Sequence, residues 1–212
     1  MAASNLPAGP DKVLMETVVI SKPFIFDGEA VLLSRLFEAG LECFHLRKPE
    51  ESEENIRTFL EGIPPEHRKK IVIHNHLKLF KDYQLGGVHI SGIHRDGLVE
   101  ALKDSLPGLL STSVHTLAEL KALDGIYRYV FFSPVFKSIS KKDYGPSGDL
   151  DDVVSYIRDK DNICPVYALG GVSAKNIFKV GELGFSGAAL CGAVWASDDP
   201  VSEFCKIRDL CH

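Results

Sequence analysis

Tyr129-Val-Phe-Phe-Ser-Pro-Val-Phe-Lys-Ser-Ile-Ser-Lys-Lys-Asp-Tyr-Gly145 combines a strand-like run with a polar loop. Its first four residues are aromatic or β-branched, which is typical of a buried strand. Pro134 interrupts ladder pairing, and the loop behind it carries three lysines and two serines before Gly145. In a barrel enzyme such a loop presents cationic and hydroxyl groups to an anionic substrate. A surface turn with lysines has a similar composition, so the rest of the chain decides between these interpretations.

Seven further strand-like runs are spread along the chain, each followed by a helix-like or turn-like segment. They are Thr17–Ile20, Cys43–Leu46, Ile71–Ile73, Gly87–Ile90, Leu109–Ser113, Pro165–Leu169 and Ser186–Leu190. Strands that alternate with helices and are apolar on both faces predict a parallel sheet covered by helices. A doubly wound open sheet is the alternative, but the Gly-rich first turn typical of it is absent. We therefore predict an α/β protein with a single (β/α)8 TIM barrel.

Composition agrees with one soluble domain. The chain has 212 residues, of which 45% are hydrophobic, and a formal net charge of −5. This length suits a small barrel, and the charge argues against nucleic-acid or membrane partners. Five scattered cysteines without a C-x-x-C pair favour a reduced, cytoplasmic protein. We expect residues 1–14 to form a flexible N-terminal tail and residues 15–212 the barrel; a homo-oligomer is compatible with the sequence.

The polar residues that suit chemistry follow the predicted strands. In a TIM barrel the active site lies at the carboxyl ends of the strands. Gly170-Gly171 and Gly192 follow the last two strands, where backbone N–H groups of this barrel commonly bind phosphate. Glycines that only turn a tight corner would look similar. Glycines after both of the last two strands nevertheless predict a small phosphorylated substrate.

Seven motifs, in this order, resemble the thiamine phosphate synthase/TenI superfamily. They are His45-Leu-Arg-Lys, His74-Asn-His, Gly87-Val-His-Ile, Ser113-Val-His-Thr, Ser133-Pro-Val-Phe-Lys-Ser-Ile-Ser-Lys, Ala168-Leu-Gly-Gly-Val and Gly187-Ala-Ala-Leu. The resemblance spans about Val18 to Trp195 and implies a TIM barrel. Synthases of this superfamily join hydroxymethylpyrimidine pyrophosphate to thiazole phosphate with Mg²⁺ and release pyrophosphate. TenI-type members bind thiazole phosphate, and a characterised type aromatises the thiazole by proton transfer.

The resemblance also implies a role for each matching position. The thiazole phosphate is expected at the last two strand ends, on Gly170, Gly171, Cys191 and Gly192. Pyrophosphate is expected on Arg47, Asn75, Ser138, Ser140 and Lys141. Ser113 is expected near the reacting pyrimidine. Serine replaces threonine at positions 138 and 140, which keeps both hydroxyl groups.

The sequence departs from the synthase pattern in the Mg²⁺–pyrophosphate half of the site. The two aspartates that bind Mg²⁺ in synthases fall at His76 and at His94. Imidazole is a poor ligand for Mg²⁺, which prefers an octahedron of oxygen atoms. The second-strand lysine of synthases falls at Pro49, with Lys48 one position early. Loss of the metal would slow departure of pyrophosphate, because its developing charge would be less stabilised.

His115 occupies the position of the proton-transferring histidine of TenI-type tautomerases. Imidazole titrates near neutral pH and can move a proton between two ring atoms of a substrate. We therefore expect a TenI-like thiazole tautomerase that uses His115 and needs no cofactor. One alternative is a Mg²⁺-dependent thiamine phosphate synthase that also binds the pyrimidine pyrophosphate. A second alternative is a barrel that binds thiazole phosphate without turnover.

A zinc hydrolase is a competing hypothesis from another class. Six histidines fall near the predicted mouth: His45, His74, His76, His89, His94 and His115. Strand alternation places His74 and His76 on one face and Asn75 on the other, so not all six can line the bore. No strand-end Asp or Glu accompanies them. The sequence therefore favours a site without a metal, and it assigns His89 a hydrogen-bonded structural role.

Overall fold

Eight parallel strands close into a barrel in the order in which they occur along the chain. The computed structural model describes residues 15–92, 97, 99, 106, 109–123, 125–137, 145, 148–159 and 164–211. The predicted tail, 1–14, lies outside these residues. The strands are β1 (Glu16–Ile20), β2 (Phe44–Leu46), β3 (Ile71–Ile73), β4 (Gly87–Ile90), β5 (Leu110–Val114), β6 (Tyr127–Phe132), β7 (Val166–Leu169) and β8 (Gly187–Leu190). The predicted (β/α)8 barrel is confirmed.

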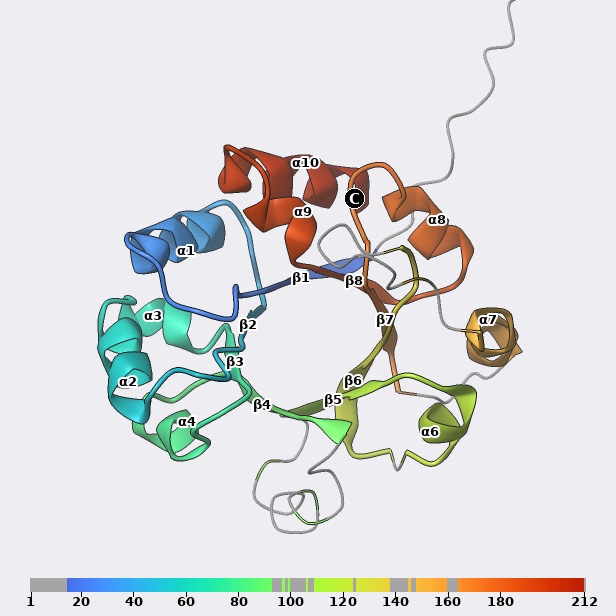
Figure 1. Ribbon diagram of the computed structural model, residues 1–212, viewed down its shortest axis with the longest axis horizontal. Coiled ribbons are helices and arrows are strands. Elements are labelled where there is room, and N and C mark those ends of the chain that lie inside the picture. Colours follow the sequence, from blue (N-terminus) through green and yellow to red (C-terminus); the bar gives the residue numbers. More distant parts are fainter. Residues whose placement is uncertain are drawn as a thin grey trace, which may run out of the picture.

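Helices surround the barrel on its outside (Figure 1). They are α1 (Glu29–Glu38), α2 (Glu53–Glu61), α3 (Pro65–Arg68), α4 (Lys78–Asp82), α6 (Leu117–Lys121), α7 (Leu150–Asp159), α8 (Ile177–Glu182), α9 (Gly192–Trp195) and α10 (Pro200–Cys211). Among the described residues, no helix is long and apolar enough to cross a membrane.

Local signals explain where several helices begin. Thr116 caps α6 and accepts a hydrogen bond from the backbone N–H of Glu119 at 3.1 Å, as the sequence predicts. Ser52 caps α2 in the same way. Ser173 is of a residue type favoured at helix N-caps, but Asn176 is the N-cap residue of α8. The Asn176 carboxamide oxygen instead accepts from the Ser173 backbone N–H at 2.8 Å, which stabilises the turn before the helix.

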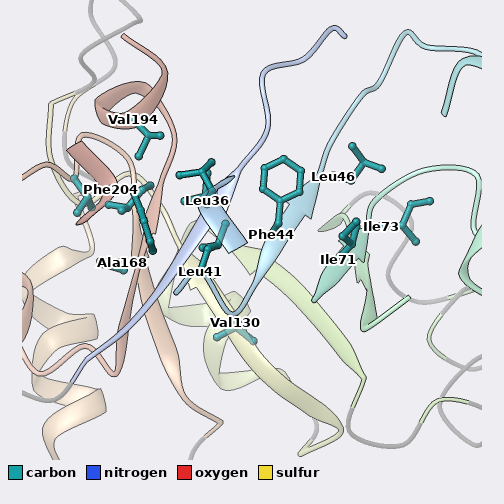
Figure 2. Close-up of a cluster of buried hydrophobic side chains, with 14 of the residues drawn as sticks. Leu36, Leu41, Phe44, Leu46, Ile71, Ile73, Val130, Ala168, Val194 and Phe204 are labelled. Carbon is teal, nitrogen blue, oxygen red and sulfur yellow. The ribbon is translucent and has the colours of Figure 1, made fainter. Parts of the chain in front are cut away.

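The hydrophobic core has two layers because successive strand residues point to opposite faces of the sheet. The larger layer lies between the strands and the helices, and Figure 2 shows part of it: Leu36, Leu41, Phe44, Leu46, Ile71, Ile73, Val130, Ala168, Val194 and Phe204. The smaller layer fills the bore with Val18, Ile20, Tyr129, Phe131, Tyr167 and Ala189. The bore is therefore a packed core. Polar groups that perform chemistry must lie at the mouth, or must take bore positions in place of apolar side chains.

Candidate functional site

Histidine and serine side chains take the bore positions on one side of the barrel. His45, His74 and His89 come from β2, from the residue after β3 and from β4. We call these three residues the bore histidines. His45 Nδ1 lies 2.9 Å from His74 Nε2, and the rings of His74 and His89 stack with centroids 4.2 Å apart. Three imidazoles thus occupy positions where the opposite side of the bore has apolar and tyrosine side chains.

Hydroxyl groups hold two of these rings. His45 Nε2 lies 2.5 Å from the Tyr129 hydroxyl, and the two ring nitrogens of His89 each lie 3.0 Å from a serine hydroxyl, Ser111 and Ser113. The predicted hydrogen-bonded role of His89 is confirmed. Burial lowers the pKa of His45 and His74 well below the usual histidine value; repulsion by His89 adds to this effect at both rings, and His45 and Arg47 add to it at His74. Both rings are therefore neutral at neutral pH.

His115 lies at the exposed end of β5, two positions beyond Ser113. Its Nδ1 lies 2.8 Å from the Ser133 carbonyl oxygen and 3.3 Å from the Ser133 hydroxyl. A carbonyl oxygen only accepts, so Nδ1 carries the hydrogen in this arrangement and Nε2 is the basic nitrogen. The His115 backbone N–H donates to the Glu119 carboxylate at 2.7 Å. The cap of α6 therefore also fixes the backbone of His115.

Gly170 and Gly171 follow β7 with positive φ angles of 96° and 69°. A Cβ at Gly171 would lie 2.4 Å from the Lys137 carbonyl oxygen, and one at Gly170 would lie 3.0 Å from Cα of Pro134. The backbone after β6 continues alongside, because the Phe136 N–H donates to the Gly170 carbonyl at 3.0 Å. These glycines thus permit the close approach of two loops at the mouth. Phosphate binding by them stays a prediction.

Positive charge gathers at the end of β8. Burial is the main cause of the raised pKa of the Cys191 thiol, while Arg47, Lys22 and Lys48, in this order, oppose the rise electrostatically. Arg47 also contributes to lowering the pKa of His74. The exposed Arg47 side chain at the end of β2 therefore acts on both β3 and β8. Cationic side chains therefore act on the ends of both strands, an arrangement that suits a phosphorylated ligand.

A family profile described as "Thiamine monophosphate synthase" matches residues 18–194, which is most of the barrel. This chain belongs to that family. A thiamine-phosphate synthase of Streptococcus suis is 28% identical over 177 residues, covering 80% of this chain and 76% of the relative. One of Bacteroides fragilis is 26% identical over 186 residues, with 82% and 88% covered.

Solved structures agree with the family. The crystal structure of thiamine phosphate pyrophosphorylase from Bacteroides thetaiotaomicron superposes with a TM-score of 0.75 at 28% identity, covering 92% of this chain and 97% of that chain. The enzyme of the same name from Pyrococcus furiosus also gives a TM-score of 0.75, at 18% identity over 94% and 96% of the chains, which shows the shared fold.

Two positions of this chain, His76 and His94, correspond to the Mg²⁺-binding aspartates that the family resemblance implies. His76 has a left-handed backbone with φ 54°, and its Nε2 lies 2.8 Å from the Glu51 carbonyl oxygen. That contact requires an N–H on Nε2, so only Nδ1 keeps a lone pair, and an imidazole nitrogen is a poor ligand for Mg²⁺. The position of His76 therefore does not fit Mg²⁺. His94 lies outside the described residues.

Lys48 does not replace the family's missing lysine. Its side chain is fully buried, and its ammonium group lies 2.7 Å from both carboxylate oxygens of Glu29 and 2.6 Å from the Phe24 carbonyl oxygen. A lysine held by three acceptors inside the fold is not directed at a ligand in the mouth. Its charge still contributes to the potential at Cys191.

The predicted site residues fall into two groups in the structure. Arg47, Asn75, Ser113, His115, Gly170, Gly171, Cys191 and Gly192 lie at or beside the carboxyl ends of their strands, as expected. Ser138, Ser140 and Lys141 lie outside the described residues. Sequence reasoning missed the contact of His45 with Tyr129 and the grouping of His45 with the other two bore histidines. The available signal was the alternation in His45-Leu46-Arg47, which places His45 on the same face as Arg47.

Proposed function

We propose that this protein is a transferase of the thiamine phosphate synthase type. It would join hydroxymethylpyrimidine pyrophosphate to thiazole phosphate and release pyrophosphate. The family match over residues 18–194 and the named relatives support this proposal more than they support a TenI-like tautomerase. The observation that carries it is the placement of Arg47, Lys22 and Lys48 where their positive charges act on Cys191 at the end of β8. Both substrates are polyanions, and such a mouth would attract and orient them.

The proposed residue roles come from the family resemblance and are compatible with the places of these residues at the mouth. Gly170, Gly171 and the Cys191-Gly192 turn would hold the thiazole phosphate, since backbone N–H groups can approach closely there. Arg47 would bind pyrophosphate oxygens with its planar set of donors, and the Asn75 amide would add a donor beside it. Ser113 would lie against the pyrimidine. Bond breaking then depends on charge stabilisation by these donors, because His76 does not fit the metal.

A thiazole tautomerase is the second candidate, and one observation favours it. Nδ1 of His115 faces the Ser133 carbonyl, which fixes the tautomer and leaves Nε2 as the basic nitrogen. Such a histidine can remove a proton from one atom of a bound thiazole and return it to another. This reaction needs neither pyrophosphate departure nor a metal. His76, which does not fit Mg²⁺, is therefore compatible with a tautomerase.

Pyrophosphate release distinguishes the candidates. The purified protein is incubated with both substrates, with and without Mg²⁺, and pyrophosphate and thiamine phosphate are measured. Formation of both products supports the synthase; their absence, together with isomerisation of thiazole phosphate, supports the tautomerase. Thiazole phosphate binding without either turnover would indicate a binding protein and contradict both.

The variant His115→Ala refines the result. A tautomerase loses turnover by about 10²–10⁴-fold while it keeps thiazole phosphate binding, which is the usual contribution of a general base. Added imidazole then serves as the control, because partial rescue shows that a missing proton acceptor and not misfolding causes the loss. Synthase activity that His115→Ala leaves unchanged would exclude a role for this ring in that reaction.

A further inference from the structure

The bore histidines bring three potential metal ligands to one place. One ring nitrogen of each of His45, His74 and His89 lies within 4.8 Å of the others. Strand register produces this grouping, because Ile73 pairs with Val88 and the next residues in line are His74 and His89. His45, which pairs with Val72 in the register, reaches His74 from β2, with Nδ1 2.9 Å from His74 Nε2. Three neighbouring strands thus supply the set.

The remaining nitrogens of two rings have oxygen partners. His45 Nε2 lies 2.5 Å from the Tyr129 hydroxyl, and His89 Nδ1 lies 3.0 Å from the Ser111 hydroxyl. Tyr129 can accept from His45 while it donates to the Cys43 sulfur, which lies 3.3 Å away. Metal-binding histidines commonly donate their second N–H to an oxygen in this way, which orients the ring and makes the ligand nitrogen more basic.

We propose that His45, His74 and His89 form a binding site for one divalent transition-metal ion of the Zn²⁺ class. Imidazole suits zinc, copper, nickel and iron, whereas Mg²⁺ prefers oxygen ligands. Three histidines with a fourth position open to water or substrate are a known arrangement for zinc. The site differs in residues and in ligand chemistry from the Mg²⁺ positions at His76 and His94. It does not depend on which reaction the barrel catalyses.

The protonation state of the cluster suits a metal. Coordination requires neutral imidazoles, and the complete burial of the His45 ring disfavours its charged form. The hydrogen between His45 Nδ1 and His74 Nε2 must leave this contact when a metal enters. His74 can carry it on Nδ1 instead, so that coordination by neutral histidines requires a change of tautomer and no net loss of a proton.

Coordination requires a small movement of the rings. His74 and His89 now stack with an interplanar angle of 18°, whereas ligands of one ion must point toward a common centre. Two nitrogens bound at about 2.0–2.1 Å lie at most about 4.2 Å apart, which is less than the 4.8 Å limit of the cluster. Rotation about the histidine χ2 torsion, which has a broad energy profile, supplies such a movement.

The charge of the proposed metal site predicts which ligand would take the fourth coordination position of the ion. Three neutral ligands leave the full double charge on the ion, and Arg47 adds positive charge close to His74. An anionic oxygen, from hydroxide or from a phosphoryl group, would balance this charge. Ser113 lies two residues closer than Ser111 to the carboxyl end of β5 and 3.0 Å from His89 Nε2. It would give up this contact and become a partner for that oxygen.

Cobalt titration tests the site directly. Untagged full-length protein is stripped with a chelator and titrated with Co²⁺, whose visible absorption reports coordination in a site of low symmetry. We expect one equivalent to bind, Zn²⁺ to displace it, and His74→Gln to weaken Co²⁺ binding at least about tenfold. His76→Ala is the matched control, because His76 contacts the Glu51 carbonyl and lies outside the cluster; it should bind Co²⁺ like the wild type.

Two results would overturn the proposal. The first is a wild-type protein that shows no Co²⁺ absorption and no rise in thermal midpoint with Zn²⁺, which would assign the cluster to a metal-free hydrogen-bonded core. The second is binding that His76→Ala abolishes and His74→Gln preserves. The thermal measurement uses the wild type alone and remains decisive if His74→Gln fails to fold, since a ligand of the folded state raises its stability.

Discussion

The Lys48 ammonium group lies 2.7 Å from the Glu29 carboxylate, and both side chains are fully buried. This ion pair connects α1 with the segment that follows β2. Burial is the main influence on both groups: it raises the pKa of Glu29 and lowers that of Lys48. The pair therefore fixes the backbone on one side of the mouth, and it explains why Lys48 does not take the ligand-binding role of a nearby family lysine.

Removing one member of this pair should strongly destabilise the protein. Lys48→Met leaves a buried carboxylate without a cation, and we expect the free energy of unfolding to fall by about 3–5 kcal/mol. Urea denaturation measures this change. The double variant Glu29→Leu/Lys48→Met is the control and should recover most of the loss, because no buried charge remains. A single variant as stable as the wild type would show that the pair is unimportant.

Gly171→Ala should disturb the mouth. The alanine would need a left-handed backbone, and its Cβ would lie 2.4 Å from the Lys137 carbonyl oxygen. The left-handed conformation alone costs about 1–2 kcal/mol, and displacement of the loop adds to it. We expect a lower thermal midpoint and weaker binding of thiazole phosphate. Gly62→Ala is the control, since its φ is −71° and a Cβ there would approach no atom closer than 3.4 Å.

Buried thiols predict reduced stability at alkaline pH. Burial raises the pKa of Cys43 and of Cys211 to about 11, from 9.0 for an exposed thiol. Between pH 9 and 11 the unfolded chain loses these protons while the folded chain keeps them, so stability falls as the pH rises. Each thiol contributes about 1.4 kcal/mol per pH unit in this window.

The variant Cys211→Ala isolates one of these contributions. Urea denaturation under reducing conditions is compared at pH 8 and pH 10.5. The stability difference between wild type and Cys211→Ala should shift in favour of the variant at the higher pH, because the variant has no thiol to titrate. A difference that stays constant with pH would contradict the raised pKa.

Arg47→Met should weaken the binding of phosphorylated ligands. A charge-assisted hydrogen bond contributes about 1.5–3 kcal/mol, which corresponds to roughly 10- to 150-fold in affinity. Calorimetric titration with thiazole phosphate and with pyrophosphate measures the effect, which should be larger for pyrophosphate. Arg57→Met on α2 is the matched control, since Arg57 pairs with Glu53 and Asp82 away from the mouth. Equal affinities for all three proteins would remove Arg47 from the site.

The sequence by itself determined the barrel and the positions of its strand ends. Short runs such as Ile71–Ile73 and Gly87–Ile90 alternate with helical segments, and the structure has both strands with these bounds. The Thr116 cap was also readable, because an N-cap and its partner lie three residues apart. The strand runs and this cap both depend on residues that are close together in the sequence. The first residue of α8 could not be read from the sequence in this way, because Asn176 and not Ser173 is the N-cap residue.

The tertiary structure alone decided which polar side chains meet. The sequence showed six histidines near the mouth, but closure of the barrel selected His45, His74 and His89 and placed His45 against Tyr129, 84 residues away. It likewise turned Lys48 toward Glu29 and away from the ligand side. Strand alternation fixes the face of each residue, whereas its partners depend on the register between strands and on the closed ring. Those relations are long-range, so no local pattern contains them.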